Sequence, residues 1–180
     1  MNAVDMYYST VSNPCGRTPV TVQTESEMLR ALHEILTNRQ PQPTVMYAKD
    51  RPTIGRRNRP DHQIKFDVDA ESGIGALHAA GMPNFIPPRA RHGKREDAEE
   101  QASDEMRDWA SKADIIAVDD DGTLMVCEVK RPLYIDFDTR TEFPADAVLP
   151  LDKVREALLE FMATEQRPTC VAWQDSEIIV

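Results

Sequence analysis

The chain has 180 residues, a length that predicts one domain with a sizeable buried core. Hydrophobic residues make up 41% and charged residues 29% of the chain, which is typical of a soluble globular protein. The formal net charge of −10 argues against general affinity for nucleic acid, because binding to phosphate requires a basic surface. The same charge suits a basic partner, since opposite electric fields accelerate encounter.

Cysteine and histidine usage predicts neither a disulfide framework nor a metal site. The three cysteines lie far apart, and the four histidines form no pair at ligand spacing. We therefore expect reduced thiols, no cofactor and no metal. The first 16 residues lack the basic and apolar segments of a signal peptide, and no run approaches the ~20 apolar residues of a membrane helix. The sequence thus predicts a cytoplasmic protein without membrane association.

The first 80 residues are predicted to form strands and one helix. Residues 19–23 alternate and are rich in β-branched side chains, which predicts a strand. Thr24 and Glu27 have the spacing of a capping box, and apolar residues then recur at helical spacing to about Asn38. Further strands are predicted at 44–48, 63–69 and 74–80, the last two as a hairpin, and a polar, basic loop at 51–61.

The middle of the chain is acidic. After a proline-rich, basic loop at 83–95, residues 96–112 are charged and predict an exposed helix in which Trp109 belongs to a thin apolar stripe. Eleven acidic residues lie between Glu96 and Asp121, opposed only by Arg107 and Lys112. This acidic run is either a solvated face or a binding surface for a basic partner.

The last third is predicted to begin with a hairpin of residues 115–118 and 123–129 around a turn that contains Gly122. A strand at 133–137, a helix that starts at Pro150 and a final strand at 169–173 follow. The apolar residues at helical spacing are Leu151, Val154, Leu158, Phe161 and Met162. Together the elements predict an α+β domain with a mostly antiparallel sheet and helices packed on one face.

Residues 113–132 also resemble the active-site core of the PD-(D/E)xK nucleases. Glu128 and Lys130 share one face of the predicted strand, and Asp114 is placed to lie on the neighbouring one. Two carboxylates would then hold Mg²⁺ and the lysine would orient water. A strand that emerges into solvent gives the same pattern, and aspartate and glycine are ordinary turn residues. A metal-dependent nuclease is therefore the alternative reading.

A second resemblance covers more of the chain. Glu142-Phe143-Pro144, Pro150, Glu160-Phe161 and the segment from Arg167 to Trp173 are similar to immunity protein family one of bacterial polymorphic toxin systems, in its actinobacterial branch. Residues 59–78 resemble the first hairpin of that family, and residues 19–36 its opening strand and helix. The chain departs from the family by an acidic, helical insertion at about 82–113 within a single domain, 1–180.

The resemblance implies a non-enzymatic antidote that binds a secreted toxin, such as a nucleic-acid deaminase, and covers its active site. Glu128 and Lys130 are then not catalytic. An acidic inhibitor can occupy a basic, nucleic-acid-binding cleft, so the acidic run supplies the expected contacts. These are Asp104, Glu105, Asp108, Trp109, Asp119, Asp120 and Asp121. For Trp109 the role of interface anchor and that of a core residue are both open. The loop from Arg56 to Arg59 is a second candidate contact zone.

Overall fold

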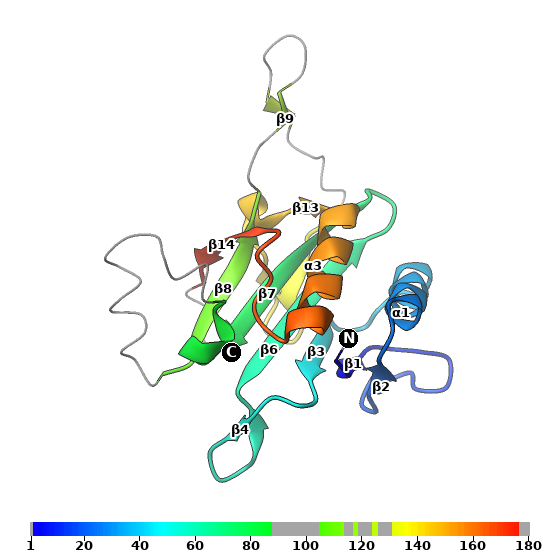
Figure 1. Cartoon of the computed structure of the whole chain (residues 1–180). Helices are drawn as coiled ribbons and strands as arrows, with labels where there is room; N and C mark the ends of the chain where they lie inside the picture. Colours follow the sequence, from blue (N-terminus) through cyan, green and yellow to red (C-terminus); the bar gives the residue numbers. More distant parts are fainter. Residues whose placement is uncertain (1, 88–104, 114–116, 119–123, 126–130, 177–180) are drawn as a thin grey trace, which may run out of the picture.

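The computed structural model describes residues 2–87, 105–113, 117–118, 124–125 and 131–176. Within these ranges, short strands dominate and two α-helices are present (Figure 1). The elements in chain order are β1 (Val4–Tyr7), β2 (Val20–Val22), α1 (Glu25–Thr37), β3 (Thr44–Ala48), β4 (Thr53–Ile54), β5 (Arg59–Pro60), β6 (His62–Asp69), β7 (Ile74–Gly81), β8 (Arg107–Lys112), β9 (Ala117–Val118), β10 (Leu124–Met125), β11 (Tyr134–Asp136), β12 (Thr141–Glu142), β13 (Leu149–Pro150), α3 (Leu151–Thr164) and β14 (Ala172–Asp175).

One antiparallel sheet organises the fold, with the strand order β14-β8-β7-β6-β3-β1-β2 and β13 paired to β7. The β6–β7 hairpin is its centre and pairs from His62 opposite Gly81 to Asp69 opposite Ile74. Both helices pack on the same face, where α3 lies across the sheet and α1 lies beside it (Figure 1). The predicted α+β class, with a mostly antiparallel sheet and helices on one face, is confirmed.

Helix α1 has the predicted start. The Thr24 hydroxyl accepts the N–H of Glu27, and the Glu27 carboxylate accepts the N–H of Thr24, so the capping box is confirmed. Four side chains at helical spacing are buried against the sheet: Met28, Ala31, Leu32 and Ile35. The helix forms because its first-turn donors are satisfied and its apolar stripe faces the core.

Helix α3 starts after Pro150, as predicted, and covers the centre of the sheet. Its buried side chains are Val154, Ala157, Leu158, Phe161 and Met162, and Leu151 is half-buried. The helix approaches β7 closely at Gly75, where an added Cβ would lie 3.0 Å from Cγ2 of Val154. A larger residue at position 75 would push the helix away from the sheet, because interiors are close-packed.

The opposite face of the sheet is covered by the segment from β11 to β13. Leu133, Ile135, Phe143 and Ala147 form a small apolar cluster with Ala76 and Ala110 from the sheet. Hydrogen bonds fasten this cover. The Tyr134 N–H donates to Oδ2 of Asp67 at 3.0 Å, and the Ser111 hydroxyl donates to the carbonyl of Ala147 at 2.6 Å.

The predicted helix over 96–112 is wrong for residues 107–112, which form β8 between β7 and β14. Along β8, side chains alternate between the two faces of the sheet, so that Trp109 joins the helix-side core and Ala110 the opposite cluster. Pairing on both edges outweighs the helix-permissive composition of this stretch. Residues 105 and 106 of that predicted helix are not helical either, and its residues 96–104 lie outside the described residues.

Two further strands differ from the prediction. The sequence analysis did not predict β1, which lies between β2 and β3. The last strand is Ala172–Asp175 rather than 169–173, because the preceding residues pack against α3. The predicted hairpin at 115–129 is confirmed where it is described, with Val118 opposite Leu124 and Ala117 opposite Met125.

Glu160 on α3 holds that preceding segment in place. Its carboxylate accepts hydrogen bonds from the N–H and the hydroxyl of Thr169, at 2.8 and 2.7 Å, and from the N–H of Cys170 at 2.9 Å. Partial burial raises the pKa of Glu160, but these hydrogen bonds lower it by more, so that its net pKa lies below the ordinary value.

Glu160→Gln should therefore reduce the free energy of unfolding by about 1–3 kcal/mol, because the amide turns an N–H group toward a backbone donor. The carboxylate stabilises the fold above its unfolded pKa of about 4.5, and this contribution is lost as pH falls through the lowered folded pKa. Urea denaturation at pH 7 and at pH 3 measures both effects. An unchanged midpoint at pH 7 would show that the three hydrogen bonds contribute nothing.

Candidate functional site

Three of the predicted contact residues are described, and they differ in exposure. Glu105 is exposed just before β8, Asp108 is half-buried on β8, and Trp109 is buried. Asp104 and Asp119 to Asp121 lie outside the described residues.

Trp109 is a core residue, one of its two expected roles. Its side chain is 3% exposed, and the Arg167 guanidinium lies 4.3 Å from the centroid of its ring. The same guanidinium lies 5.7 Å from the ring of Trp173, whose Nε1–H donates to the carbonyl of Pro168. This stack joins β8 to the segment before β14. We therefore leave Trp109 out of the contact surface proposed below.

Asp108 belongs to a buried polar group on the covered face of the sheet. Its Oδ1 lies 3.3 Å from Nε2 of His78, although neither ring nitrogen of His78 has hydrogen-bond geometry to a partner among the described residues. Burial and, to a smaller extent, the nearby Lys65 lower the pKa of His78 to about 4. Burial also raises the pKa of Asp108. His78 is therefore neutral at pH 7, and the half-buried Asp108 carboxylate lies beside this buried, uncharged ring.

The open part of this face forms a groove of about 560 Å³ over β1 and β3. Its floor includes Val45 and the rings of Tyr7 and Tyr47, whose centroids lie 5.9 Å apart in an edge-to-face arrangement. Lys49 and Pro60 line its rim. The sequence analysis missed this groove because it did not predict β1, although the alternation of residues 4–7 was a usable signal.

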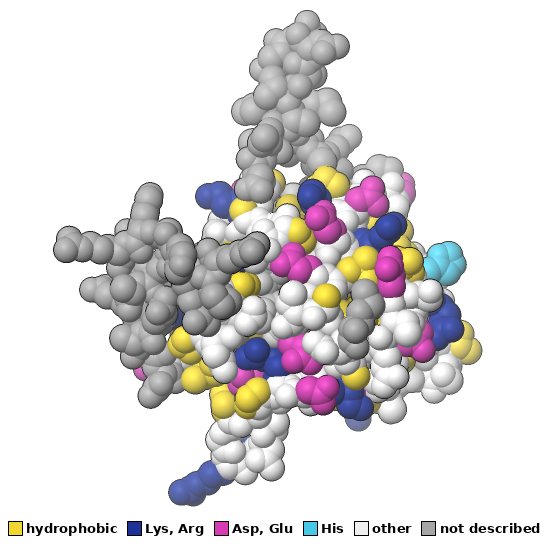
Figure 2. All heavy atoms as spheres, viewed as in Figure 1, with side chains coloured by type: hydrophobic (Ala, Val, Ile, Leu, Met, Phe, Trp, Pro, Cys, Tyr) yellow, Lys and Arg dark blue, Asp and Glu magenta, His cyan; other side chains and the backbone are white. Residues whose placement is uncertain are grey.

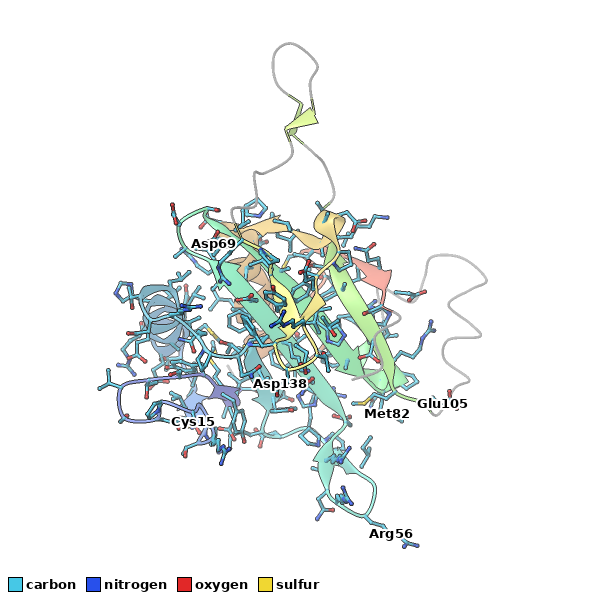
Figure 3. The ribbon with its side chains drawn as sticks, turned by 180° about the vertical axis from the view of Figure 1, so that it is seen from behind. Cys15, Arg56, Asp69, Met82, Glu105 and Asp138 are labelled. Atoms are coloured by element: carbon cyan, nitrogen blue, oxygen red, sulfur yellow. The ribbon has the colours of Figure 1, made fainter. Side chains whose placement is uncertain are left out.

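The rim of the groove continues into the connection between β3 and β6, residues 49–61, which we call the arm. Strands β4 and β5 pair within it, with Thr53 opposite Pro60 and Ile54 opposite Arg59. The arm extends beyond the end of the sheet, and Arg56 at its tip points away from the molecule (Figures 1 and 3). The predicted basic loop at 51–61 is therefore a short hairpin.

No group of three His, Cys, Asp or Glu side chains that could hold a metal ion occurs in the described ranges. The nuclease alternative depends on Asp114, Glu128 and Lys130, all of which lie outside those ranges. No helix in the part of the chain that the structure covers is both long and apolar enough to cross a bilayer.

No curated protein matches the chain. A family model does match its C-terminal part, over residues 126–175. The matched range contains the residues between 142 and 173 on which the predicted resemblance rests, and it does not extend to residues 19–36 or 59–78. In the fold this segment contains three parts: the β11 to β13 cover on the face of the sheet opposite the helices, helix α3 and strand β14. The matched family is described as Immunity protein Imm1, and through residues 126–175 this chain is similar to it.

Proposed function

We propose that this chain is an immunity protein, a non-enzymatic antidote that binds a cognate bacterial toxin and covers its active site. The observation that carries the proposal is the match of residues 126–175 to Imm1. The match includes the whole of α3, with buried side chains such as Leu158 and Phe161. The similarity therefore concerns the packing that defines the fold rather than an isolated loop.

For the partner, we propose a toxin of a polymorphic system that acts on nucleic acid, such as a deaminase, in the cytoplasm of the producing cell. A toxin that grips nucleic acid carries a basic cleft, and the net charge of −10 suits an inhibitor that enters it. The proposed contacts are acidic side chains: Asp104, Glu105, Asp108, Asp119, Asp120 and Asp121. Asp108 is the least accessible of the described members, with 19% of its side chain exposed.

Co-expression tests the proposal. The toxin domain encoded beside this chain should arrest growth of a bacterial host, and the chain should restore growth. Glu128→Ala and Lys130→Ala should protect as well as the wild type does. The purified chain with Mg²⁺ or Mn²⁺ should leave single-stranded and duplex DNA intact. Failure to protect would contradict the proposal, and metal-dependent cleavage that either substitution abolishes would establish the nuclease instead.

The same pair tests the acidic contacts. Changing Asp119, Asp120 and Asp121 together to asparagine should slow association with the inactivated toxin domain, because rim charges act mainly on the association rate. It should also flatten the dependence of that rate on ionic strength, since less attraction remains to be screened. Stopped-flow association at several salt concentrations measures both. An unchanged rate would exclude this turn from the contact surface.

A further inference from the structure

The arm is longer than the fold requires. Strands β3 and β6 are antiparallel neighbours, with Thr44 opposite Phe66 and Met46 opposite Ile64, and such neighbours are commonly joined by two to five residues. Here residues 49–61 join them. Every residue from Pro52 to Pro60 is exposed or half-buried, so this part of the arm adds nothing to the core.

The base of the arm is nevertheless held by a buried network. The Arg51 guanidinium donates from Nε and Nη2 to the two carboxylate oxygens of Asp61, at 3.1 and 2.7 Å. It also donates to the carbonyl of Glu165 and to Oδ1 of Asn84, each at 3.1 Å, and lies 5.3 Å from the ring centroid of Phe85. Asp61 and Arg51 have side chains only 2% and 9% exposed.

The neighbouring His62 completes the network. Its Nε2 accepts the N–H of Ala48 at 2.7 Å, so Nδ1 carries the proton that it shares with Oδ1 of Asp61 at 2.8 Å. Burial lowers the pKa of His62, and the hydrogen bond to Asp61 raises it by less. The net pKa lies below the ordinary value, which keeps the ring neutral. Both ends of the arm are thereby fixed to the sheet. A fixed element loses little freedom when it binds, which favours affinity.

The tip of the arm presents positive charge on an acidic protein. Arg56, Arg57 and Arg59 are exposed, and no ion pair within the described ranges includes them. On the face shown in Figure 2, acidic and basic side chains are interspersed over the body, whereas a dark blue side chain projects from the end of the arm. Arginine is the side chain best suited to bind carboxylates in a planar, two-pronged contact.

The surroundings of the arm favour a protein as the occupant. The tyrosine-lined groove adjoins its base, and protein interfaces are enriched in tyrosine and arginine. Glu105 lies at the same end of the sheet, as Figure 3 shows. There Gly81 pairs with both His62 and Arg107, so two strand spacings of ~10 Å in all separate the base of the arm from the start of β8. One partner can therefore contact the arm and the proposed acidic residue Glu105 together.

We propose that the arm docks on a carboxylate-rich rim of the cognate toxin, outside the toxin's basic cleft, with the groove over β1 and β3 receiving an apolar side chain beside it. This inference rests on the proposed function, because it takes the toxin as the partner. Nucleic acid is the poorer occupant, since three arginines compete with a net charge of −10. A second copy of the chain is also the poorer occupant, because it would bring the same arginines and the same net charge of −10, and like charges repel.

Charge reversal tests the arm. In one variant Arg56, Arg57 and Arg59 are changed to glutamate, and in the matched control Arg17, Arg39 and Arg155, which are exposed elsewhere, are changed likewise. The two variants have equal net charge. The arm variant should slow association with the inactivated toxin domain at least ~10-fold, while the control stays within ~2-fold of the wild type. Thermal unfolding should be unchanged in the arm variant, and Tyr47→Ala should raise the dissociation rate.

Each other outcome overturns the inference. Equal losses in both variants would assign the effect to net charge alone. If the wild type binds a labelled oligonucleotide at 150 mM salt and the arm variant does not, nucleic acid is the occupant of the arm. If the wild type sediments as a dimer and the arm variant as a monomer, the occupant of the arm is a second copy of the chain. If the wild type binds the toxin and the arm variant binds it equally fast, only the inference about the arm fails and the proposed function stands. If the wild type does not bind the toxin, the proposed function fails with it.

Discussion

Leu158→Ala should lower the free energy of unfolding by ~2–5 kcal/mol, the range for truncation of a fully buried leucine. Leu158 is 0% exposed, in the middle of the only α-helix that covers the centre of the sheet in the described part of the chain. The substitution removes apolar burial and leaves a cavity between α3 and the central strands. Because α3 and the central strands are both part of the native fold, the loss of free energy appears directly in the midpoint of urea denaturation.

The adjacent Leu159 provides the control for the helical register. It is half-buried at the margin of the same cluster, so Leu159→Ala should cost clearly less than Leu158→Ala. Equal costs for the two variants, or a larger cost at Leu159, would mean that α3 is rotated relative to the sheet. Exposed Glu156 on the same helix offers a baseline, and Glu156→Ala should change stability by less than ~0.5 kcal/mol.

Asp61→Asn should cost ~3–5 kcal/mol, because it leaves the buried Arg51 guanidinium without its counter-charge. Asparagine also turns an amide N–H group toward either Arg51 or the protonated Nδ1 of His62, both of which are donors. The expected result is a large drop in the unfolding midpoint, measured by denaturation or calorimetry. Arg51→Lys should lose part of the same free energy, since lysine keeps the charge but not the paired geometry.

The exposed pair of Lys49 and Asp5 is the matched control for this ion pair. Its nitrogen–oxygen distance is 3.6 Å, and the Lys49 side chain is 45% exposed. Lys49→Ala should therefore change the free energy of unfolding by no more than ~1 kcal/mol. If Asp61→Asn were as mild as Lys49→Ala, the network at the base of the arm would contribute little to the fold.

Local patterns were sufficient to predict the two helices and the central hairpin. The capping box at Thr24 and the apolar spacing of α3 are short-range signals, set by residues within one or two turns of each other. Residues 44–48 were predicted as a strand with the bounds of β3, because Thr, Val and Tyr favour strands. These elements satisfy their own hydrogen bonds or bury a regular stripe, so that the sequence around them contains most of the information.

The elements that the sequence missed depend on distant partners. β8 is a strand because β7 and β14 pair with its two edges, and neither pairing is visible in the acidic composition of residues 96–112. The buried network at the base of the arm joins Arg51 to Asn84 and Glu165, residues far apart in the chain. The groove requires β1 to lie beside β3. Sites built by long-range contacts of this kind cannot be predicted from local spacing.

The position of α3 late in the chain has a consequence during synthesis. The central hairpin is complete at Gly81, but the helix that covers its apolar face begins only at Leu151. At ~5–20 residues per second, the ~70 residues between them take ~4–14 s to translate. For that interval the ribosome carries a nascent chain whose largest apolar surface is partly bare, a condition that favours aggregation. Yield of the folded protein should therefore depend on translation speed and on chaperones that shield the growing chain until the last third has emerged.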